Sequence, residues 1–554
     1  MRHGWNGRLS LIWVMFALCC PIPGWAAPRE VTFVQNQTTV EAYDFVEVTV
    51  TVAAPDARNP FTDASVEGFF EKVGDAKQVP VAGFCDAPDG STFRIRFMPS
   101  SAGDYTYSAT YHQGDFTRTQ TGTFRATDGH RRGIVRVDPQ YPWHFIWEGT
   151  GEHYFLDGTT AFLMMGWTDE KVIQASIERL SRLKINRIRL LLAGRPSYSF
   201  WSEPIIPSGE FHVCLNPWVA ERPDSLDSPG FDYARFNIPY WQRFERMLRF
   251  ARDKDMTISV IMDWNDSKAH PAGESNDEKR YFQYAAARLG AYSNITWDLG
   301  DDISSYRNLN WSHVMGGLLV EADPYHHLAT DHPVDNTQQD RTAQWFGFTS
   351  FQQWPRPLHD WMLNQRREQA KTGRIIPQVN EEYGYEDHYP RWSPSFPDGA
   401  SADADRRAAW EMSMAGTYQT TGETAKRGTG AWPDTGGGWV NGRGDGSMVM
   451  LVGYAHMVDF FTGFEWWKAD PHDELVDHGD FCLAELGRVY AVYLPMAGKV
   501  TIKLEPGRYQ ASWFNPQNGK TSSLPEVQGP EWTSPPAPDS GDWALFLTRV
   551  KGQP

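Results

Sequence analysis

The feature that most constrains the fold is a repeated alternation of short apolar segments with amphipathic segments between about residues 141 and 461. Runs such as "INRIRLLL" have the length of buried strands, whereas "YWQRFERMLRFARDK" places Trp241, Phe244, Met247 and Leu248 on one helical face. Eight strand–helix units of this kind predict a (β/α)8 (TIM) barrel with long loops. An open doubly wound sheet is the alternative. No GxGxxG motif follows a strand, which disfavours its nucleotide-binding form.

The eight strands of this barrel can be placed on the sequence. We expect them at Ala161–Trp167, Ile185–Leu192, Thr257–Trp264, Asn294–Leu299, His327–His332, Phe346–Gln353, Ile375–Val379 and Thr417–Thr421. Helices are expected between them, with the closing helix near residues 448–461.

Both flanks of the barrel have a strand pattern without helical periodicity. "FVEVTVTV", "STFRIRFMP" and "GDYTYSATYH" alternate apolar and polar residues, which predicts an immunoglobulin-like β-sandwich over residues 27–130. We expect the barrel over 135–490. "KVTIKL" and "DWALFLTR" predict a small all-β domain over 491–554. The fold class is therefore multidomain, with two all-β domains around a barrel.

The N-terminus has the pattern of an export signal. Arg2 and Arg8 flank the start of a short apolar run, and the small residues Gly24 and Ala26 precede a cleavage position before Ala27. We therefore expect residues 1–26 to be a cleaved signal peptide and the mature chain to be secreted or periplasmic. An uncleaved anchor is the alternative.

The net charge of −17 argues against nucleic acid or an anionic membrane surface as a partner. Only Cys85, Cys214 and Cys482 remain in the expected mature chain, and no Cys/His cluster has zinc spacing, so we expect no metal and no other cofactor. The sequence does not indicate an oligomeric state. "NGRGDGS" at residues 441–447 could bind calcium, but a glycine-rich loop is the preferred interpretation.

Polar side chains gather where the predicted strands end. Barrel enzymes build their sites from the carboxyl ends of the strands, so these side chains are expected at one mouth. They are Arg189 in strand two, Asp263 and Trp264 after strand three, Asp301 and Asp302 after strand four, His332 after strand five, Gln353 and Trp354 after strand six, and Glu381, Glu382 and Tyr383 after strand seven. A structural role for His332 is an equal alternative.

Two facing carboxyl groups can cleave a glycosidic bond. One, kept protonated, gives its proton to the leaving oxygen, and the other attacks the anomeric carbon or activates water. Because side chains alternate in direction along a strand, we expect one acid of each doublet to enter the pocket.

Three of these motifs resemble a known family. "NRIRL", "NITWDLGDD" and "NEEYG" resemble the barrel glycosidases of the large retaining clan. "YFLDGTTAF", "RLGAYSNITWDLGDD" and "EEYGYE" are more narrowly similar to the apiosidase-like family of glycoside hydrolases, which often carry an N-terminal Ig-like domain. The tail "YAVYLP…WFNPQNG" resembles the C-terminal domain labelled collagen-binding in that family.

The resemblance implies a role for each matching residue. Asp302 stands at the acid/base, Asp301 at the residue that bonds the sugar 2-hydroxyl, and Glu382 at the nucleophile, followed by Tyr383. Arg189 matches the arginine that keeps the nucleophile ionised. The sequence has "DD" where the clan has "NE", so Asp302 must reach the substrate with a shorter side chain.

These observations predict an exported glycoside hydrolase that acts on a plant or microbial polysaccharide or oligosaccharide, with retention. The expected catalytic residues are Asp302 and Glu382. Arg189, Asp263, Trp264, Asp301, His332, Gln353, Trp354 and Tyr383 are expected to bind substrate. A non-catalytic carbohydrate- or matrix-binding protein is one alternative. A collagen-degrading protease is another, and the sequence contains no recognisable proteolytic motif for it.

Overall fold

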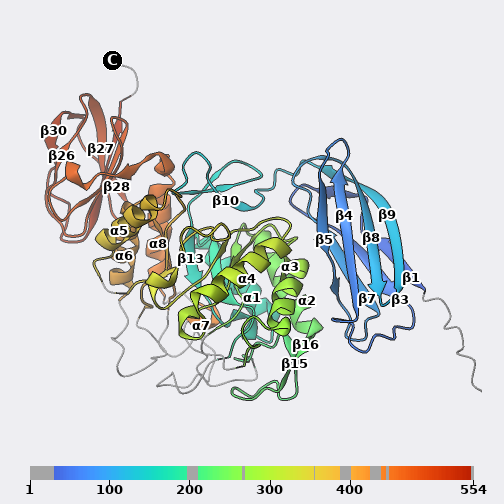
Figure 1. The fold of residues 1–554 in the computed structure, drawn as a ribbon. Coiled ribbons are helices and arrows are strands. Elements are labelled where there is room, and N and C mark those ends of the chain that lie inside the picture. Colours follow the sequence, from blue (N-terminus) through green and yellow to red (C-terminus); the bar gives the residue numbers. More distant parts are fainter. Residues whose placement is uncertain are drawn as a thin grey trace, which may run out of the picture.

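The computed structural model describes residues 30–195, 210–264, 269–354, 356–386, 401–423, 438–444 and 448–550. The predicted signal peptide and the cleavage position before Ala27 lie outside the described residues. Figure 1 shows the N-terminal β domain, the central α/β domain and the C-terminal β domain in sequence along the molecule.

Two sheets form the N-terminal domain. One has the strand order β1-β3-β7-β6 and the other β2-β9-β8-β4-β5, and their inward side chains share one apolar core. The strands are β1 (Val31–Gln35), β2 (Thr39–Glu41), β3 (Val46–Val52), β4 (Ala64–Lys72), β5 (Gln78–Ala82), β6 (Phe84–Cys85), β7 (Thr92–Phe97), β8 (Gly103–Gln113) and β9 (Phe116–Thr127). The expectation of an all-β sandwich is confirmed.

Eight parallel strands build the central barrel. Their order is β19-β18-β17-β14-β13-β22-β21-β20, and a parallel bridge between Ala329 and Phe346 joins the two ends of this order. The strands are β13 (Asp157–Thr160), β14 (Arg187–Leu191), β17 (Thr257–Ile261), β18 (Ile295–Asp298), β19 (Ala329–Thr330), β20 (Phe351–Gln352), β21 (Val379–Glu382) and β22 (Tyr418–Thr421). The predicted barrel is confirmed.

The helices follow the strands as expected. They are α1 (Glu170–Arg182), α2 (Ile238–Arg252), α3 (Asn276–Leu289), α4 (Leu309–Ala322), α5 (Leu358–Lys371), α6 (Ala402–Met414), α7 (Gly438–Asn441) and α8 (Met450–Phe461). Asp169, Ser275 and Ser401 cap α1, α3 and α6 with side-chain oxygens that accept backbone N–H groups. No helix in the described part of the chain is long and apolar enough to cross a membrane.

Two barrel strands are displaced along the sequence from the apolar runs in which we expected them. The first strand is β13, four buried residues with the sequence DGTT, and the apolar run after it turns into the 3-10 helix η1 (Met164–Gly166). The seventh strand, β21, begins at Val379, where Ile375–Val379 was expected to end, so both glutamates lie within it. The inside of the barrel carries polar side chains at these positions, and apolar character alone therefore misplaces the strands.

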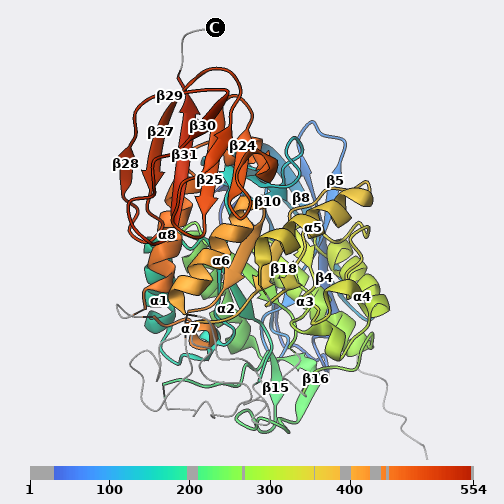
Figure 2. The same cartoon turned by 90° about the vertical axis from the view of Figure 1, so that its left-hand side faces the viewer.

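The C-terminal domain has a seven-stranded sheet and a small sheet of β26 and β30. Six strands of the larger sheet follow the order β23-β24-β25-β31-β27-β28, and the seventh, β29, pairs with β27. Its strands are β23 (Asp470–Pro471), β24 (Phe481–Glu485), β25 (Val489–Leu494), β26 (Thr501–Lys503), β27 (Arg508–Phe514), β28 (Thr521–Ser523), β29 (Val527–Gln528), β30 (Glu531–Thr533) and β31 (Trp543–Arg549). The first three begin before residue 491, where the sequence analysis places the start of this domain. Figure 2 shows the domain beyond the ends of α6 and α8.

Buried ion pairs join the outer domains to the barrel. Arg96 of β7 pairs with Glu245 of α2, and Arg288 of α3 pairs with Asp86 of the sandwich at 2.6 Å. On the other side, Arg406 of α6 donates to both carboxylate oxygens of Asp542 at 2.6 and 2.7 Å. These contacts leave the carboxyl ends of the barrel strands free of both β domains (Figures 1 and 2).

Candidate active site

Two buried arginines on β14 organise the inside of the barrel. Arg187 and Arg189 are separated by two positions, so both side chains point to the barrel interior, and both are at most 1% exposed. Arg187 donates to Glu381 Oε2 at 2.7 Å. Arg189 lies closer to the mouth and donates to Asp301, and its Nε donates to Asp298 Oδ2 at 3.3 Å.

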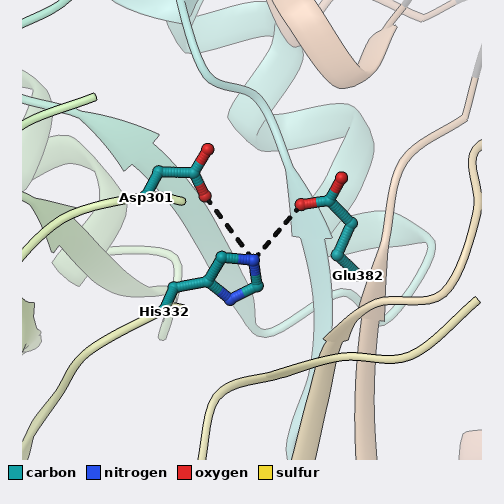
Figure 3. Close-up of side chains that lie close together, drawn as sticks. All are labelled: Asp301, His332 and Glu382. Carbon is teal, nitrogen blue, oxygen red and sulfur yellow. Dashed lines mark ion pairs between the residues drawn. The ribbon is translucent and has the colours of Figure 1, made fainter. Parts of the chain in front are cut away.

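Asp301, His332 and Glu382 converge at the barrel mouth (Figure 3). Arg189 forms ion pairs with both of these acids. The imidazole Nε2 of His332 lies 3.3 Å from Glu382 Oε2 and 3.8 Å from Asp301 Oδ1. The other ring nitrogen, Nδ1, is 2.9 Å from the hydroxyl of Ser350. Arg189 Nη1 is 3.9 Å from Glu382 Oε2, a distance that makes an ion pair but is too long for a hydrogen bond.

The chain turns sharply after β18, and this separates the two aspartates. The N–H of Asp301 donates to the carbonyl of Asp263 at 3.0 Å, which continues the parallel pairing beyond the end of the strand. Asp302 then adopts a left-handed conformation, with φ 52°, and begins the 3-10 helix η2 (Ile303–Ser305). Asp301 is buried, whereas Asp302 is half-buried at the mouth.

A bulge in β21 places the two glutamates. Phe351 of β20 pairs with Asn380, but the next residue, Gln352, pairs with Glu382, so Glu381 is an extra residue in the ladder. Both glutamates are fully buried, and each faces an arginine of β14. We expected one acid of each doublet to enter the pocket, and Glu382 joins Asp301 and His332 there, whereas Glu381 faces Arg187. That Glu381 also faces the interior was not expected, and it does so because the bulge interrupts the alternation of side chains.

Burial dominates the electrostatics of the group. Burial raises the pKa of Glu382, and Arg189 with hydrogen bonds from Gln352 and Tyr385 offsets only part of this rise. Burial also raises the pKa of Asp301, against the nearby charge of Arg189.

Burial and then the charge of Arg189 lower the pKa of His332 to about 3. Near neutral pH the imidazole is therefore neutral, and its contacts with the two carboxyl groups are those of a neutral ring rather than ion pairs.

Glu381 and Arg189 are held in their charged forms. Burial opposes the charge of Glu381, but Arg187 and Arg189 outweigh it and lower the pKa of Glu381. Burial likewise opposes the charge of Arg189, but Asp301 and Asp298 outweigh it and raise the arginine pKa.

Asp301, His332 and Glu382 are also the type of residues that bind metal ions, with ligand atoms all within 4.8 Å of one another. However, the guanidinium of Arg189 already bonds to Asp301 and stands next to Glu382. A divalent cation at this position would face a fixed positive charge at short range. The donor set therefore fits proton transfer and hydrogen bonding better than metal binding.

Five aromatic side chains form a continuous series next to the acids, which we call the aromatic wall: Trp264, Phe162, Trp439, Tyr385 and Trp354. Successive ring centroids are 5.7, 6.1, 4.3 and 5.8 Å apart. The wall follows the ends of β17, β13, β21 and β20 and includes one residue of α7. Tyr385 connects it to the acids, because its hydroxyl interacts with Glu382 and lowers the pKa of that group.

The structure brings together most of the predicted site residues. Arg189, Asp301, His332 and Glu382 form the central group, and Trp264 and Trp354 belong to the aromatic wall. Their roles toward substrate remain predictions.

Asp263 lies beside the central group. Its Oδ1 accepts the N–H of Trp264 at 2.9 Å, and burial raises its pKa to about 8. Gln353 is half-buried, and its backbone N–H donates to Asn380. The substrate roles of both residues also remain predictions.

Tyr383 is not brought to the central group. Its hydroxyl donates to Gln419 at 2.9 Å, and its ring packs with Leu358 and Met362 of α5 on the helix side of β21. After the bulge, strand alternation directs Glu382 inward and Tyr383 outward.

Sequence reasoning missed several residues of the site: Arg187, Asp298, Gln352, Tyr385, Trp439 and Phe162. The sequence could have indicated Arg187, because the spacing of "RIR" places two arginines on one face of a strand. Gln352 was passed over for its neighbour Gln353. No sequence pattern indicates Trp439 as a site residue, because its position depends on how the chain after β22 returns to the barrel.

The parallel barrel carries its acids at the mouth where barrel enzymes build their active sites. Residues 212–422 match the family model of the apiosidase-like catalytic domain. Residues 39–112 match a domain of unknown function, DUF5060. No curated protein is significantly similar in sequence to the chain.

Solved structures share the fold. A candidate glycoside hydrolase from Bacteroides vulgatus ATCC 8482 is 21% identical, with a TM-score of 0.76 over 93% of this chain and 100% of that chain. A glycoside hydrolase family 5 protein from the same strain is 16% identical, with a TM-score of 0.58 over 76% of this chain and 93% of that chain. At these identities the likeness concerns the fold.

Proposed function

We propose that the protein is an exported glycoside hydrolase that cleaves a plant or microbial polysaccharide or oligosaccharide with retention of configuration. The observation that carries the proposal is the meeting of acids from β18 and β21 beside one buried arginine at the barrel mouth. The match of residues 212–422 to an apiosidase-like catalytic domain supports the same class.

In the proposed reaction Glu382 is the nucleophile and Asp302 the proton donor. The Glu382 carboxylate attacks the anomeric carbon while the bond to the leaving oxygen breaks and Asp302 gives that oxygen its proton. Water then attacks the glycosyl ester, Asp302 takes a proton from the water, and Glu382 leaves as a carboxylate.

The positions of the two aspartates favour Asp302 over Asp301 as the proton donor. The leaving oxygen must reach the proton donor, and the charge of Arg189 opposes protonation of Asp301, although burial raises the pKa of that group overall. Asp301 bonds to Arg189 and is buried, whereas Asp302 is half-buried at the mouth, where a leaving group can reach it. Asp301 is then suited to accept a hydrogen bond from a sugar hydroxyl.

The aromatic wall supports a sugar as the substrate. Flat rings pack against the C–H faces of sugars, and Trp354 of the wall is half-buried, whereas the other four rings are at most 5% exposed and would support it from behind. A sugar between the wall and the acids would have its anomeric carbon next to Glu382.

Export rests on the sequence of residues 1–26. We expect protein recovered outside the cytoplasm to start at or near Ala27. N-terminal sequencing tests this, and a start at Met1 on cytoplasmic material would contradict it.

The proposed function is tested by incubating the protein with a panel of plant and microbial oligosaccharides, beside gelatin as a protein substrate. We expect release of sugar from at least one glycan and none of the peptides that cleavage of gelatin would give. NMR of the first-formed product should show the anomeric configuration of the substrate. Inverted product would refute retention, and sugar binding without release would favour the non-catalytic alternative.

A further inference from the structure

The buried pair of Glu381 and Arg187 has no part in the reaction proposed above. Both side chains are at most 1% exposed, and their atoms meet at 2.7 Å. Arg187 also donates to Ser259 Oγ of β17 at 2.8 Å and to Thr420 Oγ1 of β22 at 3.3 Å. Arg187 is therefore fixed by three strands of the barrel.

The location of the pair connects it to the proposed nucleophile. Glu381 is the extra residue of the bulge in β21, and Glu382 follows it directly. In a regular strand Glu382 would point to the opposite side from Glu381. Both can face the interior only because the bulge is present, and the bulged residue is held by an ion pair to a rigid arginine.

We infer that Glu381 is a positioning residue for Glu382, and that its ion pair with Arg187 maintains the bulge that directs the nucleophile into the site. The inference rests on the proposed function for its catalytic consequence, but the geometry that it predicts can be measured separately. A displaced pair should affect the alignment of Glu382 in the transition state more than the binding of sugar, which the proposed function assigns to the aromatic wall.

Steady-state kinetics of Glu381→Gln tests the catalytic consequence. The amide keeps the shape but removes the charge that holds Arg187. We expect kcat to fall by about 10- to 100-fold, as small misplacements of catalytic groups do, with KM changed by less than about two-fold. An unchanged kcat would overturn the inference. Loss of all activity in Glu381→Gln with near-normal turnover in Glu382→Gln would also overturn it, because Glu381 would then be the nucleophile.

Asp157→Asn is the matched control. Asp157 is another fully buried acid of the barrel, and it bonds to Gln419 rather than to an arginine. Burial raises its pKa well above the ordinary value, so the amide replaces a neutral group. We expect wild-type kcat from this variant. An equal loss in both variants would indicate a general effect of altering the barrel interior and would overturn the specific role of Glu381.

A crystal structure separates failure of this inference from failure of the proposed function. If the wild-type protein cleaves no glycan, the proposed function fails. The claim that the Glu381–Arg187 ion pair maintains the bulge in β21 can still be tested by the structure of a variant. In Glu381→Ala, which removes the anchor, we expect Glu382 to lose its 3.3 Å contact with His332. A bulge and a Glu382 position identical to those of the wild type would refute the inference, whatever the activity.

Discussion

The chain has two doublets of adjacent acids near one barrel mouth, Asp301–Asp302 and Glu381–Glu382, and their side chains have different surroundings. In β21 a bulge turns both glutamates inward, and each faces its own arginine on β14. After β18 the doublet is divided, because Asp301 is buried and bonds to Arg189, while Asp302 has a left-handed backbone and is half-buried. The comparison teaches that the local backbone, and not the residue type, decides which acid of a doublet is buried beside an arginine of β14.

The largest expected losses of turnover come from replacing one acid in each doublet by its amide. Glu382→Gln removes the nucleophile and should abolish turnover within detection. Asp302→Asn removes the proton donor and should lower kcat on the order of 10²–10⁴-fold, as loss of general acid catalysis does. Circular dichroism should show intact folds. Near-normal turnover in either variant would remove that residue from its proposed role.

Within the β18 doublet, Asp301→Asn should have a smaller effect than Asp302→Asn. It weakens one charge-assisted hydrogen bond of Arg189, a loss of about 1.5–3 kcal/mol, which corresponds to roughly 10- to 150-fold in kcat/KM. The measurement is kcat/KM on the best glycan of the panel. A greater loss in Asp301→Asn than in Asp302→Asn would exchange the roles assigned to the two aspartates.

The pH profile tests the electrostatics of the β21 doublet. Burial raises the pKa of Glu382, and the nucleophile must be ionised, so kcat/KM should fall as pH decreases through this raised pKa. The acidic limb should therefore lie above the ordinary glutamate pKa of about 4.3.

Arg189→Met, which removes the cation that lowers the pKa of Glu382, should move the acidic limb to higher pH. A limb at or below the ordinary value in the wild type, or no movement in the variant, would contradict this account of the charges.

The smallest expected effect concerns stability rather than catalysis. Burial raises the pKa of Asp263 to about 8, so the folded state holds a proton that the unfolded chain releases near pH 4. The stability that this group contributes is complete below about pH 4 and is lost as pH rises toward 8.

Asp263→Asn should therefore show a shallower decline of melting temperature between pH 5 and 8, by about a few degrees. Calorimetry across this pH range measures the two slopes. Parallel curves for the wild type and the variant would show that Asp263 is not protonated in the folded protein.

Most of the fold could be predicted because it depends on local periodicity. Helix α2 (Ile238–Arg252) covers the amphipathic segment "YWQRFERMLRFARDK" that predicts it, with both ends displaced by two residues. The strands β13 and β21 were displaced because their residues inside the barrel are polar. A strand that must hold buried threonines or glutamates does not show the apolar run by which strands are recognised.

The candidate site could be predicted where it depends on the ends of strands. Arg189, Asp301, His332 and Glu382 follow from the rule that parallel strands bring their carboxyl ends to one mouth. The bulge at Glu381 could not be predicted, because it depends on the pairing of β20 with β21. Trp439 likewise depends on tertiary packing. The resemblance of the C-terminal tail to collagen-binding-type domains stays a prediction.

The separation of the Asp302 and Glu382 carboxyl groups, in a crystal of the protein with a product sugar bound, tests the central claim most directly. A retaining pair must reach adjacent atoms of one bond, and we predict about 5–5.5 Å with the sugar between the acids and the aromatic wall. A separation of about 8 Å or more would favour inversion, with a water molecule between the acids and the sugar. A product sugar bound away from both acids would contradict the account altogether.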